Sequence, residues 1–327
     1  MKNIENFENV YENIRINNEY ELTSAYEKAK QESKKRNKFI LITCLILDAI
    51  IIYLGLNNPL LNKTIGTEFF MISLFQLLVP ILFIDIFTFV LYSIIFSKKI
   101  GNYSIIFKNT IIKELLSYFY NNLTYTPQKI LSQNVYDEGK YNEYYNRYRS
   151  DDHLTGKIDD KYDIEMADVL TQKVETHRDS KGRTRTTTTT IFSGIFAKIN
   201  IDKSINTTLK IRRNTSIFNK DRLNMDSQEF EKYFDVSSDN QIIGMQLLTA
   251  DIMQKLVDFY INTDIRFDIT INNNLLYLRF HCGRMFEIGN FKDGAIPKNT
   301  LNKYYDILKF MNELTALLID TINITEV

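Results

Sequence analysis

Two long apolar runs near the N-terminus constrain this chain more than any other feature. Phe39–Leu56 holds eighteen residues with one charge, and Phe69–Phe96 holds 28 residues with one charge. A helix needs about 20 largely apolar residues, with a range of about 17–25, to cross a bilayer. A soluble core rarely carries two such runs joined by so short a segment as 57–68. We therefore expect a transmembrane hairpin over residues 39–96, with helices at 39–56 and about 72–96.

Basic residues flank this hairpin on one side only. Six lysines and arginines lie within Lys28–Lys38, opposed by Glu32 alone, and Lys98 and Lys99 follow the second run. The connecting segment carries only Lys63. Because basic flanks stay on the cytoplasmic side, we expect a multi-pass protein of the cytoplasmic membrane with both termini in the cytoplasm.

Each apolar run contains one acid. Asp48 and Asp85 lie at similar distances from the basic flanks, so they can meet across the helix pair, with Thr88 on the same stripe as Asp85. Two ionised carboxylates are not stable together in hydrocarbon, so we expect at least one of them to be protonated. This pattern allows an ion-responsive or transport site, but also a neutral acid that holds helices or protomers together.

Composition excludes some functions and leaves others open. Lysine plus arginine and aspartate plus glutamate both total 40, so the net charge gives no reason to expect nucleic acid. Of the two cysteines, Cys44 lies in an apolar run and Cys282 in a strand-like segment. We expect both to be free thiols, because a bridge would have to join membrane depth to a soluble sheet.

The remaining chain predicts an α+β protein. Residues 1–38 show helical spacing of apolar residues and predict a cytosolic amphipathic helix, and 97–150 predict a helical connector that includes a tyrosine stripe. Residues 151–327 predict a cytosolic domain with an antiparallel sheet and packed helices, the latter over about 226–262 and from Pro297 to about Thr321.

Two hairpins are expected in this domain. Ala167–Thr176 and Thr184–Ile191 flank a turn-like segment. Ile265–Ile271 and Leu276–Cys282 alternate apolar and polar residues on either side of three asparagines. The tip of the first hairpin is basic and allows contacts with lipid headgroups or an acidic partner, but a solvated tip whose charges protect the sheet edges also explains it. The residues concerned are Arg178, Lys181, Arg183 and Arg185.

No pattern in the sequence predicts catalysis, a cofactor or a metal. The nucleotide-binding, zinc-protease and serine-hydrolase motifs are absent from it. His281 and Cys282 are adjacent, which on a strand places them on opposite faces. Acids gather at Asp151, Asp152, Asp159 and Asp160 and allow cation binding, but they lack the regular spacing of a calcium loop, so we interpret them as solvated turns.

The order of these segments resembles a known family. After the paired spans come Asp152-x-x-x-Gly156, Phe192–Phe196 and Phe230–Val236. Asp202–Lys203, Asp239, Leu247–Thr249 and the closing hairpin complete the resemblance, which covers most of the chain from about residue 30. It is to the bacterial membrane proteins that contain the domain of unknown function 3137. The resemblance implies this architecture and a bacterial cytoplasmic membrane, but no activity. Asp48 and Asp85 lie outside the family's pattern.

We therefore expect a non-enzymatic, membrane-anchored interaction or scaffold module with a protein partner or a second copy of itself. A small transport or ion-responsive assembly built on Asp48 and Asp85 is the first alternative, and a protein that binds lipid headgroups is the second.

Overall fold

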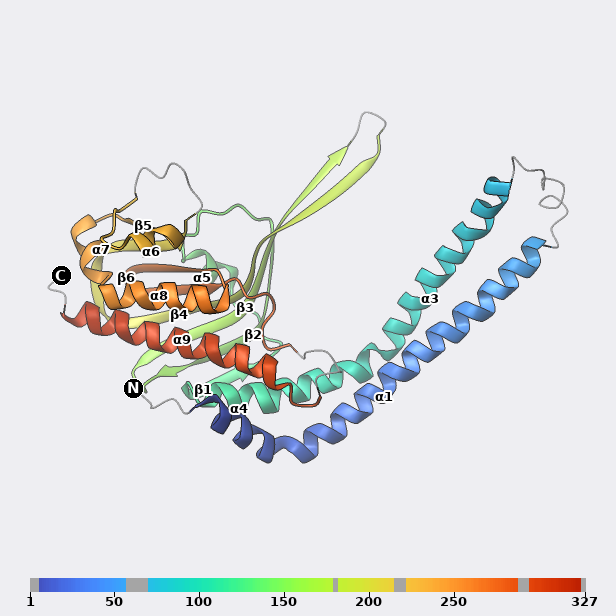
Figure 1. Cartoon of the computed structure of the whole chain (residues 1–327), viewed down its shortest axis with the longest axis horizontal. Coiled ribbons are helices and arrows are strands. Elements are labelled where there is room, and N and C mark those ends of the chain that lie inside the picture. The colour runs from blue at the N-terminus through green and yellow to red at the C-terminus, as the bar shows by residue number, and fades with distance from the viewer. Residues whose placement is uncertain (1–5, 57–69, 179–181, 215–221, 288–293, 325–327) are drawn as a thin grey trace. The chain divides into compact units, whose positions relative to one another are not determined.

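A computed structural model describes residues 6–56, 70–178, 182–214, 222–287 and 294–324 (Figure 1). The chain forms two compact units. The first contains Met1–Asn17, Lys108–Gly289 and Ile296–Val327, and the second contains Asn18–Phe107 and Asn290–Ala295. The predicted α+β class is confirmed: a mixed unit of helices and antiparallel sheet accompanies two long apolar helices.

Two helices form most of the second unit. Helix α1 spans Phe7–Leu56, its first residues belonging to the first unit, and helix α3 spans Phe70–Phe107. Both contain a segment long and apolar enough to cross a membrane, and 0% and 6% of these segments are buried. Since large apolar side chains cover the outer surface of both helices, this part of the chain is suited to a lipid environment.

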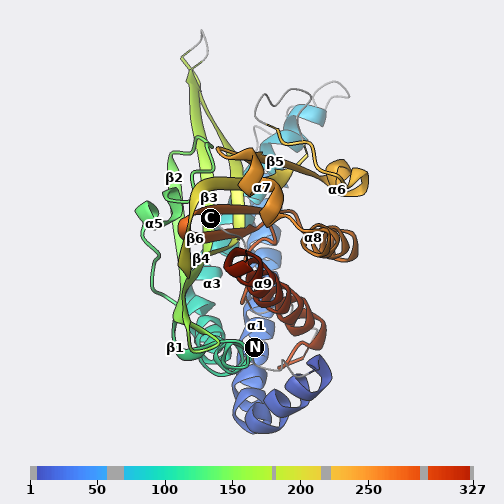
Figure 2. The same ribbon diagram turned by 90° about the vertical axis from the view of Figure 1, so that its left-hand side faces the viewer.

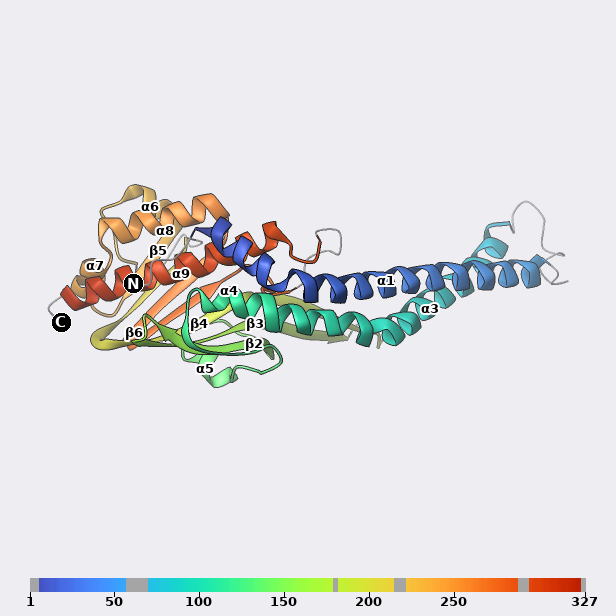
Figure 3. The ribbon, with the colours of Figure 1, turned by 90° about the horizontal axis from the view of Figure 1, so that it is seen from below.

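Aromatic and hydroxyl contacts hold these helices together, and they run beside one another (Figure 3). The hydroxyls of Thr43 and Tyr92 lie 3.1 Å apart, and the rings of Phe39 and Tyr92 stack with centroids 6.1 Å apart. Near the C-terminal end of α3, the Tyr103 hydroxyl donates to the backbone carbonyl of Ala295 at 2.8 Å.

The first unit is built on a six-stranded antiparallel sheet with the order β1-β2-β3-β4-β5, and β6 also pairs with β4. The strands are β1 Asn121–Thr126, β2 Arg147–Ile158, β3 Tyr162–Arg178, β4 Thr184–Arg213, β5 Phe234–Ser238 and β6 Phe267–Phe280. Strand β4 is 30 residues long, and its register irregularities between Asn200 and Thr208 let it pair with three neighbours along its length.

The predicted hairpin between β3 and β4 extends beyond the sheet as a two-stranded arm (Figures 1 and 2). Toward the arm, the last residue of β3 that pairs with β2 is Gln172, and the last residue of β4 that pairs with β6 is Ile195. Residues 173–178 and 184–189, which we call the arm, therefore pair only with each other. Every residue in 182–190 is exposed.

Helices and loops bury both faces of the sheet (Figure 2). Helices α8 (Ala250–Thr263) and α9 (Lys298–Ile324) lie on one face, where Phe259 and Phe310 stack with centroids 3.7 Å apart. The short helix α5 (Gln133–Asp137) lies on the other face, over a core that contains Tyr136, Phe192 and Phe196. The remaining helical segments are π-helix η1 (Lys108–Ile112), α4 (Lys113–Ser117), α6 (Gln228–Tyr233) and α7 (Gln241–Leu247).

Two expectations from the sequence are wrong. Residues 265–282 do not form a hairpin, because β6 runs through the three asparagines as one strand. Asn273 adopts a left-handed conformation (φ 55°), and this bends the strand without reversing it, while β4 is long enough to pair with both halves. The helical connector over 97–150 is also interrupted, since β1 and the first residues of β2 lie in it.

Tertiary contacts explain why the predicted connector is not helical throughout. The tyrosine stripe at 141–148 has helical spacing, but residues 138–146 form an irregular segment held against the sheet by tertiary contacts. Within 226–262, helices form as expected, but β5 separates α6 from α7, and α8 follows as a third helix.

Candidate functional site

The chain carries a buried group of charges where β2 departs from regular pairing. The register between β2 and β3 shifts between Asp151 and Leu154, and Asp152 adopts a left-handed conformation with φ 55°. A non-glycine residue held in this region is strained and persists only when its surroundings fix it. The bulge directs the Asp152 side chain to a position where it is 0% exposed.

Asp152 is held there by a cation and a phenol. The Lys108 ammonium donates to Asp152 Oδ2 at 2.6 Å and to Glu287 Oε1 at 2.9 Å, and the Tyr125 hydroxyl donates to Asp152 Oδ1 at 2.5 Å. Burial raises the pKa of Asp152 to about 6, although the charge of Lys108 opposes this shift. Lys108 is the first residue after α3, so the buried ion pair lies where the chain enters the sheet unit.

A second pair of acids lies beside this ion pair. Asp151 and Asp168 are cross-strand partners on β2 and β3. The Arg284 guanidinium pairs with Asp151 and, at 2.8 Å, with Glu287. Asp168 is 3% exposed, and its Oδ2 accepts a hydrogen bond from the backbone N–H of Met285 at 2.9 Å. Burial, with the nearby Asp151 carboxylate, raises the pKa of Asp168 to about 8, so its carboxyl group is mostly protonated at neutral pH.

These three aspartates form a cluster in which one carboxylate oxygen from each lies within 4.8 Å of the others. Such an arrangement of oxygens can hold a divalent cation. Here, however, Lys108 and Arg284 already supply two positive charges to Asp152 and Asp151. The arrangement is therefore a mixed network of ion pairs with one additional, neutral carboxyl group.

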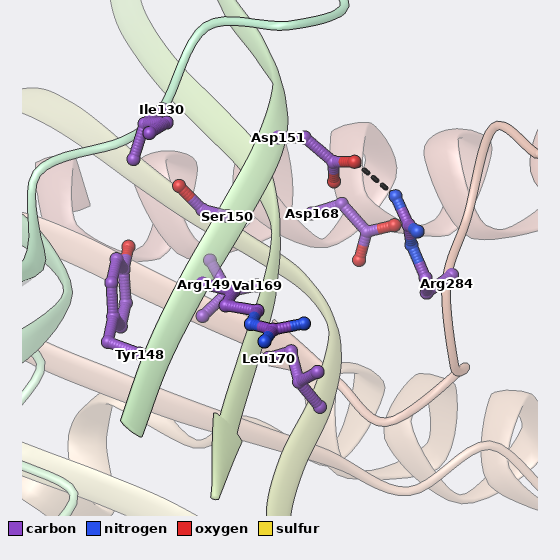
Figure 4. A pocket seen from close by; sticks show the side chains of 9 residues that line it. All are labelled: Ile130, Tyr148, Arg149, Ser150, Asp151, Asp168, Val169, Leu170 and Arg284. Carbon is purple, nitrogen blue, oxygen red and sulfur yellow. Dashed lines mark hydrogen bonds and ion pairs between the residues drawn. The ribbon is translucent and has the colours of Figure 1, made fainter. Parts of the chain in front are cut away.

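A cavity of about 330 Å³ adjoins the cluster (Figure 4). In the figure, the side chains of Asp151 and Asp168 point toward Arg284 from neighbouring strands. The cavity combines charged groups with an apolar wall, which is the composition expected of a small-molecule site. Its lining consists of Ile130, Tyr148, Arg149, Ser150, Asp151, Asp168, Val169, Leu170 and Arg284.

A second buried network, around Arg279, has a structural role. Arg279 is 1% exposed and donates to Asp268 Oδ2 at 2.7 Å and to Glu143 at 2.5 and 2.9 Å. Its guanidinium lies 4.0 Å from the centre of the Tyr141 ring. His281 Nε2 lies 2.9 Å from the same Asp268 oxygen. Since Glu143 and Tyr141 belong to the irregular segment 138–146, this network fastens that segment to β6.

The acids predicted within the apolar runs lie on the facing sides of α1 and α3. Asp48 Oδ1 and Asp85 Oδ1 are buried and have no hydrogen-bond partner within the described residues. The Cys44 thiol lies within reach of Asp85 and Thr88, and Thr88 is 3% exposed. These groups therefore face the interior of the helix pair and are not presented to the outside. Cys44 and Cys282 are both free thiols, as expected.

The basic residues predicted at the tip of the first hairpin lie at the end of the arm. Arg178, Arg183 and Arg185 are exposed, and Arg178 Nε donates to the Gly182 carbonyl at 3.4 Å. Lys181 lies outside the described residues. The structure does not bring the arm cations together with the aspartate cluster, which lies within the paired part of the sheet.

The sequence interpretation of Asp151 and Asp152 as solvated turn residues is wrong. Asp159 and Asp160 do lie in an exposed turn, but Asp152 is fully buried. Lys108, Asp168 and Arg284 were not identified as site residues. One local signal was present: Asp168 interrupts the apolar segment Met166–Leu170, and a charge inside a buried strand needs a specific environment.

Together, the two apolar helices and the sheet unit define a membrane-associated protein with an α+β domain. Residues 190–319 match the family described as "Protein of unknown function (DUF3137)", so the predicted resemblance to this family is confirmed over that part of the chain. No curated protein matches the sequence. One solved structure is similar, the crystal structure of the mycobacterial trehalose monomycolate transport factor A, TtfA. It shares 9% identity, with a TM-score of 0.29, over 57% of this chain and 88% of that one.

Proposed function

We propose that this protein is a non-enzymatic module of a bacterial cytoplasmic membrane, anchored by α1 and α3, which binds a protein partner through the arm. In this proposal, the anchor is a two-pass hairpin with both termini in the cytoplasm. The outward-facing apolar side chains of α1 and α3 and the basic residues that flank them support this topology.

The single observation that carries the proposal is the exposed arm. An isolated two-stranded ribbon is marginally stable in water, because it buries little apolar surface. Here half of the arm's residues are threonine, a β-branched residue that favours extended backbone, and its two outer edges pair with no other described strand. Unpaired strand edges accept an extended segment of another chain. The exposed Arg178, Arg183 and Arg185 favour an acidic partner.

Site-specific cross-linking tests this proposal. A photo-reactive amino acid in place of Thr188, on the arm, should give an adduct of discrete mass after irradiation of intact cells. The same amino acid in place of Asp251, an exposed residue of α8, is the matched control and should give none. Equal adducts from both positions, or none from Thr188, would contradict a partner at the arm.

Lipid headgroups are a second candidate for the arm, supported by the same exposed cations. Proteoliposomes that contain the full chain would then tether added vesicles rich in anionic lipid. Tethering should weaken at high salt, because screening acts strongly on exposed charges. Tethering that is insensitive to salt, or equally strong with zwitterionic vesicles, counts against this candidate.

An ion-responsive membrane unit is the remaining candidate. It is supported by the buried oxygens of Asp48 and Asp85, which lack hydrogen-bond partners among the described residues. Flux of protons or monovalent cations into proteoliposomes, abolished by Asp48→Asn with Asp85→Asn, would support it. Equal flux with the double variant would reject it.

A further inference from the structure

The two outer edges of the arm are not equivalent, because a side chain already occupies one of them. The Asn146 amide donates to the Val174 carbonyl, and its oxygen accepts from the Val174 N–H, both at 2.8 Å. The Asn146 backbone N–H also donates to the Gln172 carbonyl at 3.1 Å. Asn146 therefore takes the place of a neighbouring strand on the β3 edge, at the point where the arm leaves the sheet.

These contacts also show which backbone groups of the arm face outward. In an antiparallel pair, the N–H and C=O of one residue point to the same side, and successive residues alternate. Because the backbone groups of Val174 point away from β4, those of Glu175 point toward it and pair with Thr187, the residue opposite. On either side of Thr187, Thr186 and Thr188 therefore direct their N–H and C=O groups to the outer edge of β4.

The β4 edge of the arm is open along its length. Thr184, Thr186 and Thr188 each present a backbone N–H and C=O there, and no described strand pairs with them on that side. On the β3 edge, the contact between Asn146 and Val174 interrupts the corresponding row. A strand that adds to a sheet makes backbone hydrogen bonds at every second residue, so the uninterrupted β4 edge is the better template.

The side chains beside the β4 edge favour an acidic segment. Arg185 is exposed and makes no hydrogen bond or ion pair with another described residue. Lys173 and Glu175, on the same face of the arm, already pair with each other at 2.7 Å. Opposite residues of neighbouring strands have Cβ atoms about 4.5–5.5 Å apart, so a carboxylate opposite Arg185 can reach its guanidinium. A second copy of the arm carries the same cations and is a poorer match.

We propose that an extended, acidic segment of the protein partner adds as a further strand along the β4 edge of the arm. Its backbone pairs with Thr184, Thr186 and Thr188, and an aspartate or glutamate of the segment lies opposite Arg185. This inference rests on the proposed function, because it names the edge and the chemistry of a partner that binds at the arm.

Proline substitutions on the two edges test the choice of edge. Proline removes the backbone N–H and is tolerated in a strand where that group faces outward. Thr186 and Thr176 lie opposite each other in the arm, and their N–H groups face outward at the two different edges. With the photo-reactive amino acid at Thr188, Thr186→Pro should reduce the cellular adduct about fivefold or more, because it removes a backbone hydrogen bond to the added strand. Thr176→Pro is the matched control and should leave the adduct within about twofold of the parent.

Charge reversal tests the chemistry of the segment and leaves the backbone unchanged. Arg185→Glu should reduce the adduct about fivefold or more, whereas Arg178→Glu, at an exposed position of the other strand, should reduce it less. Mass spectrometry of the adduct should identify a segment of another protein with an aspartate or glutamate within about four residues of the cross-linked position. An adduct with a second copy of this chain, or with a segment that lacks acids there, would overturn the proposal.

This inference and the proposed function fail in different ways. If Thr188 gives no adduct in the otherwise unmodified chain, no partner binds at the arm and both are rejected. If the adduct forms but Thr186→Pro and Thr176→Pro change it equally, the partner at the arm stands and its addition to the β4 edge is rejected.

Discussion

Asp168 makes the stability of the sheet unit depend on pH in a way that a single substitution should remove. Its folded-state pKa is about 8, against an ordinary value of 3.8 for an aspartate side chain. Between these two values the folded chain keeps a proton on Asp168 and the unfolded chain does not. Stability from this group is therefore fully present below pH ~3.8 and is lost as pH rises toward 8.

The size of this effect follows from the width of the window. Each pH unit within it corresponds to ~1.4 kcal/mol, so the free energy of unfolding should fall by ~4 kcal/mol between pH 5 and pH 8. Asp168→Asn keeps an oxygen that accepts from the Met285 N–H but has no proton to lose. The variant should therefore lack this component and gain stability relative to the unmodified chain as pH rises.

Thermal unfolding of the full chain in a neutral detergent, followed by far-ultraviolet circular dichroism, measures this difference. For a unit of this size ~1 kcal/mol corresponds to ~2–4 °C in Tm, so the two proteins should diverge by ~8–16 °C between pH 5 and pH 8. Asp160→Asn, at an exposed turn, should track the unmodified chain. Parallel profiles for the unmodified chain and Asp168→Asn would refute the conclusion that Asp168 is held protonated.

Two further substitutions test the buried contacts. Lys108→Met removes the cation from a fully buried carboxylate and should lower the free energy of unfolding, measured by denaturant titration, by ~3–5 kcal/mol. Lys113→Met, at an exposed position, is the control and should change it little. Equal losses in the two variants would contradict a stabilising role for the buried ion pair. Gly194→Ala places a methyl group 1.8 Å from the Phe280 carbonyl oxygen and should prevent recovery of folded protein. Gly283→Ala has only left-handed strain (φ 72°) and open space, so it should fold with a loss of ~1–2 kcal/mol, and similar yields of the two glycine variants would exclude the clash.

The sequence predicted best those elements whose signals are local. The hairpin of β3 and β4, the helices within 226–262 and the helix after Pro297 follow from alternation, helical spacing and turn residues. In contrast, Asn272–Asn274 have the composition of a turn, but the long partner strand β4 holds both halves of β6 in line. Pairing over such a distance along the chain leaves no local pattern.

The candidate site was less predictable for the same reason. Asp151 and Asp152 are sequence neighbours typical of a solvated turn, and only the bulge in β2 buries Asp152. Its partner Lys108, and Glu287, which binds the same ammonium group, are distant in sequence from each other and from β2. Periodicity identifies which residues are buried in regular strands and helices, but it does not identify a charge buried by an irregularity.

Topology in living cells is the central claim of this account, and one labelling experiment tests it directly. The protein would carry Thr188→Cys on the exposed arm, with Cys44→Ser and Cys282→Ser to remove the native thiols. A membrane-impermeant maleimide should label the membrane-bound protein only after the cytoplasmic membrane has been permeabilised. Labelling in intact cells would place the sheet unit outside the cytoplasm and contradict the account.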